Sequence, residues 1–304
     1  LRGSVETTTR IRLAPSSTKI TLTADLQHTR IELSPLGWTK PAGENATLEI
    51  HARPESKGKL RFSKIRFFAD EARISGFGHI QTGSPMQAEF RLDPLEMGRN
   101  RLKLDYAHIN GRSDVSIRGS VLDAAPLITG FITQEKGTAK PETEDGRSFL
   151  KSAGKNQFTG SVSADLDQMR LANGRRLKGL TARSEWNGGQ LLTANLEAAF
   201  PKGEKVHIGF SPEQTGRLLS IHSADGGLLL NGLNLTENLI GGELGVAAHF
   251  AGPIPTDQPA RADVSLRRFS LMNAPTLMQI LSMASFVGLE IGRASCRERV
   301  CHRV

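Results

Sequence analysis

Apolar and polar residues alternate along most of this chain. From Ile20 to Leu26 every second residue is aliphatic, and threonine or aspartate fills the positions between. This period of two is typical of a β-strand with one apolar and one polar face. The phase shifts after His28, where Ile31 and Leu33 become the apolar positions. We therefore expect a bulge or bend near His28.

Strand-like segments continue through both halves of the chain. Asn110-Gly111 lies between two of them and is a strong signal for a two-residue hairpin. The intervals between segments predict an all-β fold with antiparallel neighbours. A segment rich in proline and glycine, residues 34–43, is expected to be a loop. Further strands are expected over 47–52, 59–68, 74–82, 86–92, 101–109, 113–119, 159–166, 180–186, 190–200, 205–210, 217–222, 243–250 and 262–269.

The apolar faces of these strands must be shielded from water. An outer-membrane barrel would turn them toward lipid and would need aromatic girdles, which one Tyr and two Trp cannot supply. We therefore predict a mainly β fold: a long antiparallel sheet, curved into an open lengthwise groove, with its apolar face inward and a few short helices. The residues expected to line this groove are Ile20, Leu22, Leu26, Leu48, Ile50, Leu102, Leu104, Val115, Ile117, Val162, Leu166, Leu192, Leu196, Val206, Ile208, Val264 and Leu266.

Three short helices are expected. Residues 122–128, with Asp123 near the cap, are expected to form a short capped helix or a turn, and a second helix runs from its N-cap Asp225 to Gly232. The third, from Asn273 to Leu289, is uncharged and too short to span a bilayer. It would pack in an ordinary core, plug the end of the groove or touch a membrane. Its apolar side would carry Leu277, Ile280, Leu281 and Ala284.

Composition divides the chain into four parts. Residues 1–131 form one β-rich segment, and 132–157 form a polar loop or linker with almost no aliphatic residues. Residues 158–289 form a second β-rich segment. An Ala-Asp-Leu motif with a following Arg recurs from 24–31 to 164–171, which suggests a repeated unit. Residues 290–304 resemble the translation of a sequencing adapter, and we interpret the chain as an internal fragment.

Several function classes are disfavoured. The net charge of +8 is scattered, so no basic stripe for nucleic acid forms. The pair Cys296 and Cys301 has the wrong spacing for a zinc site, and the histidines share no spacing. The glycines of 76–83 precede no helical pattern, so a dinucleotide loop is not expected. We expect no enzyme activity, cofactor or metal.

Several segments together carry a resemblance to a known family. They are D-G-G-L-L-L-N-G-L (225–233), I-G-G-E-L (240–244), a strand pair, and the stretch 269–289 that contains Ala274-Pro275. In the first half, A-D-L and R-I-E-L precede L-G-W-T-K-P (36–41). This ordered set resembles AsmA-like proteins, and most of all their YhdP-type branch.

The resemblance implies a long sheet rolled into an open groove that carries the acyl chains of phospholipids between the inner and outer membranes. It also implies a periplasmic location, with an inner-membrane anchor that lies outside this chain. The alternative is an envelope scaffold or an assembly factor for outer-membrane proteins, working with other envelope proteins. A hydrolase or carbohydrate-binding protein would need a polar cleft with clustered aromatic or acidic residues.

Overall fold

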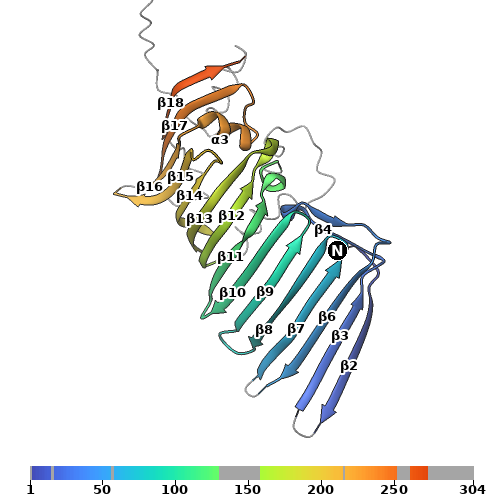
Figure 1. Ribbon diagram of the computed structural model, residues 1–304. Helices are drawn as coiled ribbons and strands as arrows, with labels where there is room; N and C mark the ends of the chain where they lie inside the picture. Colours follow the sequence, from blue (N-terminus) through green and yellow to red (C-terminus); the bar gives the residue numbers. More distant parts are fainter. Residues whose placement is uncertain are drawn as a thin grey trace, which may run out of the picture.

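Fifteen strands form one continuous open sheet, seen in the computed structural model (Figure 1). The structure describes residues 2–14, 17–55, 58–129, 158–214, 216–251 and 261–272. The prediction of a mainly β fold with few helices is confirmed. In spatial order the strands are β2 (Glu6–Ala14), β3 (Ser17–Asp25), β6 (Ala46–Pro54), β7 (Lys59–Ala69), β8 (Ala72–Gln81), β9 (Gln87–Met97), β10 (Asn100–Ile109), β11 (Arg112–Asp123), β12 (Gly160–Arg170), β13 (Arg176–Asn187), β14 (Gln190–Ala199), β15 (Lys205–Glu213), β16 (Gly216–Ser223), β17 (Leu239–Phe250) and β18 (Arg261–Leu271).

One neighbouring pair departs from the predicted antiparallel order. β11 and β12 pair in parallel, with Val115 opposite Val162 and Ile117 opposite Ala164. A parallel pair needs a long connection, because the chain must return to the end of the sheet where it started. The chain between Asp123 and Gly160 is long enough for that return. The two β-rich segments of the sequence thus belong to one sheet.

A second, three-stranded sheet contains β1 (Arg2–Gly3), β4 (Thr29–Leu33) and β5 (Trp38–Lys40). The break predicted near His28 is present, but the chain leaves the large sheet there instead of continuing it. The predicted loop 34–43 also contains structure, since the 3₁₀ helix η1 (Ser34–Leu36) leads into β5.

Lys40 fastens this small sheet. Its side chain is buried, and its ammonium group donates hydrogen bonds to the carbonyl oxygens of Thr29 at 2.9 Å, Pro41 at 2.8 Å and Gln27 at 3.3 Å. All three donors of the ammonium group are therefore used, which is what a buried cation needs. Lys40 thus links the end of β5 to the start of β4.

The helices are short. α3 (Gly226–Gly232) begins at Asp225, whose carboxylate accepts a hydrogen bond from the backbone N–H of Leu228, as an N-cap does. A helical turn over 125–129 follows Asp123, and η3 (Ala172–Gly174) follows β12. The helix expected over 273–289, with Leu277, Ile280, Leu281 and Ala284, lies outside the described residues. Within the described ranges, no helix is long and apolar enough to cross a membrane.

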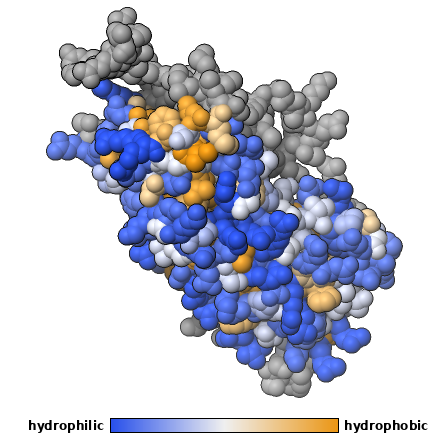
Figure 2. Space-filling view, turned by 45° about the horizontal axis from the view of Figure 1, so that its top comes forward, coloured by the Kyte–Doolittle hydropathy of each residue, from blue (hydrophilic) through white to orange (hydrophobic). Residues whose placement is uncertain are grey.

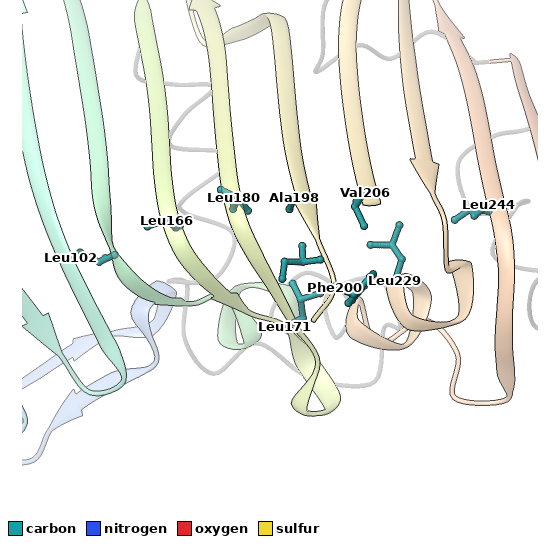
Figure 3. Close-up of a cluster of buried hydrophobic side chains, with 10 residues drawn as sticks. Leu102, Leu166, Leu171, Leu180, Ala198, Phe200, Val206, Leu229 and Leu244 are labelled. Carbon is teal, nitrogen blue, oxygen red and sulfur yellow. The ribbon is translucent and has the colours of Figure 1, made fainter. Parts of the chain in front are cut away.

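Two clusters of buried side chains hold the short elements against the large sheet. The first contains Leu26, Ile31 and Trp38 from the small sheet and its approach, packed on Ala24 and Met97. The second joins strand residues to α3 and to the flank of η3, and Figure 3 shows Leu229 of α3 beside members from neighbouring strands. The second cluster comprises Leu102, Leu166, Leu171, Leu177, Leu180, Ala198, Phe200, Val206, Leu229 and Leu244.

Candidate lipid-binding face

Three rows of side chains run across one face of the large sheet. Directly paired residues on neighbouring strands point to the same face, so the register assigns each row. The middle row is aliphatic or glycine throughout, and no charge interrupts it from β3 to β18. It consists of Leu22, Ile50, Ile65, Gly76, Leu92, Leu104, Ile117, Ala164, Ala182, Leu196, Ile208, Ile221, Val246 and Val264.

The other two rows flank the middle row along the strands. The inner row lies toward the strand ends that carry the small sheet, η3 and α3. It comprises Ala24, Leu48, Phe67, Ile74, Leu95, Leu102, Gly119, Leu166, Leu180, Ala198, Val206, Ser223, Leu244 and Leu266. Leu180 and Ala198 lie at a bulge between β13 and β14 and belong to the same buried cluster. The outer row comprises Ile20, Ala52, Phe62, Gly78, Phe90, Tyr106, Val115, Val162, Ser184, Ala194, Phe210, Leu219, Ala248 and Ala262.

The deepest burial is in the inner row, although Phe210 and Ala248 of the outer row are buried as well. Leu166 and Val206 of the inner row are each 1% exposed. Leu22 and Leu104 of the middle row stay half-buried, and neither belongs to a buried cluster. The short elements therefore cover one end of the strands, and the middle row from Ile117 to Val246 packs against the second cluster, whereas the middle row at Leu22 and Leu104 stays open. Figure 2 shows a contiguous apolar patch in the upper part of the molecule, bordered by hydrophilic side chains.

The structure brings almost all of the predicted lining residues to this face. Two lie apart from the paired rows: Leu26 is in the cluster beside the small sheet, and Leu192 lies at a bulge of β14. The others divide among the rows. Ile20, Val115 and Val162 lie in the outer row; Leu22, Ile50, Leu104, Ile117, Leu196, Ile208 and Val264 lie in the middle row; Leu48, Leu102, Leu166, Val206 and Leu266 lie in the inner row.

Several residues of the middle row are missing from the sequence-based list. Ile65, Leu92, Ile221 and Val246 have the same register and chemistry as the listed residues. A bulge in the pairing of β7 with β8, between Phe62 and Ile65, shifts the alternation and hides Ile65 from a strict period of two. Leu92 continues the alternation of Ala88 and Phe90. Ile221 and Val246 follow the alternation, so the pattern alone could have found them.

The opposite face is polar and carries ion pairs. The carboxylate of Asp105 accepts hydrogen bonds from the guanidinium groups of Arg91, at 2.5 Å, and Arg118. These bonds, above all the one from Arg91, hold the pKa of Asp105 below its usual value, although burial opposes them. A shallow cavity of about 700 Å³ lies beside this group, with Ser116 and the exposed Phe77 in its lining. Among the described residues, no group of histidine, cysteine or acidic side chains could hold a metal ion.

Asp105→Asn is expected to lower the stability of the fold at neutral pH and to change little in acid. Because the pKa of Asp105 is lowered in the folded state, its carboxylate stabilises the fold above the unfolded pKa of about 4. That contribution disappears as the pH falls through the folded pKa. Urea unfolding of both chains should show a difference at neutral pH that narrows toward acid. The same difference at both pH values would contradict the prediction, and Asp93→Asn, in the exposed pair with Lys103, is the control.

Comparison with known proteins gives no relative. Searches found no matching family model, curated protein or solved structure.

Proposed function

We propose that the open apolar face carries the acyl chains of phospholipids. The observation that supports this most is the uncharged middle row, which continues from Leu22 to Val264. Strands lie about 4.8 Å apart, so this row extends for roughly 60 Å. A site for one small molecule would need a few fixed polar groups, whereas this path offers continuous aliphatic surface. Each CH₂ group that leaves water stabilises the bound lipid by about 0.8 kcal/mol. Binding of this kind needs apolar surface and no catalytic group.

The wider setting is part of the same proposal. The sheet curves lengthwise into a groove that the middle and outer rows line, and the helix expected over 273–289 closes its end. The resemblance to AsmA-like proteins supports a periplasmic location, with a tether to the inner membrane by a segment outside this chain. Phospholipid would then pass along the groove between the inner and outer membranes.

Bound lipid is the direct test. The purified chain should yield phospholipid on solvent extraction, and the delipidated chain should bind a spin-labelled phospholipid with saturation. Immobilisation of the label's acyl chain would be visible in its electron paramagnetic resonance spectrum. A folded chain that contains no phospholipid and does not immobilise the label would overturn the proposal.

A scaffold or assembly role is the second candidate. Within the described part of the chain, β2 and β18 each pair on one side only, so each has an edge of free backbone groups. Such edges accept a strand from another chain. Crosslinks from β2 or β18 to an envelope protein, together with normal lipid binding by an edge-blocked variant, would favour this role over lipid transport.

A further inference from the structure

We propose that Tyr106, His108, Ser113 and Trp186 form a contact for phospholipid head groups at the outer margin of the apolar face. This inference rests on the proposed function and adds the orientation of the lipid to it. Tyr106 belongs to the outer row, opposite Val115. His108 lies opposite Ser113, which lies opposite Gly160, which lies opposite Trp186. These residues form one further row, beyond the outer row and away from the covered strand ends.

Hydrogen bonds link Tyr106 and His108 to Ser113, while Trp186 bonds to Ser184 of the outer row. Nδ1 of His108 lies 2.8 Å from the hydroxyl oxygen of Ser113, and the Tyr106 hydroxyl lies 3.5 Å from the same oxygen. The indole N–H of Trp186 donates to the hydroxyl of Ser184 at 2.9 Å. The four side chains of the group and that of Ser184 are only partly buried. The group therefore offers hydroxyl and ring nitrogen atoms beside an aliphatic surface.

The side-chain types fit the boundary between acyl chain and head group. Tyrosine and tryptophan combine an apolar ring with one polar atom, so they favour positions between hydrocarbon and water. The chain has one Tyr and two Trp, and this group contains the Tyr and one Trp. Gly160 separates Ser113 from Trp186 without a side chain, and Phe158 packs edge-on against the Trp186 ring at 6.3 Å between centroids.

The charges of these strands lie on the other face. Asp114 and Glu185 share a row with Ser161 on the polar side, where Arg112 pairs with both acids. The hydroxyl groups of Tyr106 and Ser113 and the indole of Trp186 are thus neutral donors at the margin. Neutral donors suit the phosphate and ester oxygens that all glycerophospholipids share. We therefore expect contact with zwitterionic and anionic lipids alike, with acyl chains along the middle row.

Depth-dependent quenching of tryptophan fluorescence tests this orientation. Three full-length chains are needed: the native chain, Trp186→Phe, and Trp186→Phe combined with Leu104→Trp. Trp38 is 4% exposed and supplies the same background in all three. Each chain is loaded with phosphatidylcholine that carries a nitroxide on its head group or near the end of one acyl chain. The Trp186→Phe signal is subtracted from the other two.

The ratio of head-group quenching to chain quenching should exceed one for Trp186 and fall below one for the tryptophan introduced at Leu104. Ser113→Ala should lower the ratio for Trp186, and Ser116→Ala, on the polar face of the same strand, should not. Equal ratios at both tryptophans would overturn the orientation while leaving lipid binding intact. Absence of quenching by either label in both chains would instead overturn the proposed function.

Discussion

Replacing Leu104 by arginine is expected to remove most of the bound phospholipid while leaving the chain folded. Leu104 lies in the middle row of β10, is half-buried and belongs to neither buried cluster. An arginine there would place a guanidinium group against the acyl chain without an acidic partner on that face. A loss of about 1.4 kcal/mol already lowers binding tenfold, and exposure of a charge to hydrocarbon costs more than that.

Ser116→Arg is the matched control for Leu104→Arg. Ser116 lies on the neighbouring strand, on the polar face, directly opposite Asp105. The Ser116→Arg substitution adds the same charge to the same part of the sheet, but on the polar face. Both variants are compared by circular dichroism and by saturation with spin-labelled phospholipid. Equal lipid binding by the two folded variants would show that the middle row does not contact the acyl chains.

Asn100→Ala is expected to lower the free energy of unfolding by about 3 kcal/mol, because it leaves several buried backbone groups without partners. Asn100 is fully buried at the start of β10. Its amide nitrogen donates to the carbonyl oxygens of Leu36 and Met97, both at 3.1 Å. Its amide oxygen accepts from the backbone N–H of Asp123 at 2.8 Å. One side chain thus joins η1, the turn before β10 and the end of β11.

Urea unfolding followed by circular dichroism measures the effect of Asn100→Ala. Arg99→Ala is the control, because Arg99 adjoins Asn100 in sequence but is exposed, and its pair with Asp123 spans 3.8 Å. Exposed pairs of this kind contribute little. If Asn100→Ala lowers the free energy of unfolding no more than Arg99→Ala does, the three hydrogen bonds of Asn100 do not stabilise the attachment of η1 to the sheet.

Local patterns in the sequence predict the strands well, since each strand depends on its own alternation. The hairpin at Asn110-Gly111 is confirmed, with both residues at positive φ, and so is the capping role of Asp225. The strand β2 was missed. The parallel pairing of β11 with β12 could not be predicted, because it depends on a connection between distant ends and not on alternation.

The residues of the candidate site and the face they share could largely be predicted from the sequence, but the depth at which each one is buried could not. Alternation places Leu22 and Leu166 alike on the apolar side, yet one is half-buried and the other is in the packed core. That difference comes from tertiary contacts of the small sheet, η3 and α3. The repeated Ala-Asp-Leu motif does carry part of this information. Its first copy leads to Ile31 and its second to Leu171, and each of these residues belongs to one of the two buried clusters.

The parallel pairing of β11 with β12 also determines at which end of the strands each later connection lies. In an uninterrupted meander, successive connections alternate between the two ends of the strands. The small sheet lies at one end of the strands, in the connection between β3 and β6. The parallel pairing of β11 with β12 then reverses once the order in which the connections alternate between the two ends. As a result η3, after β12, and α3, between β16 and β17, fall at the same end as the small sheet. A hairpin in place of that parallel pairing would have put both helices at the opposite end, over the rows that now stay open.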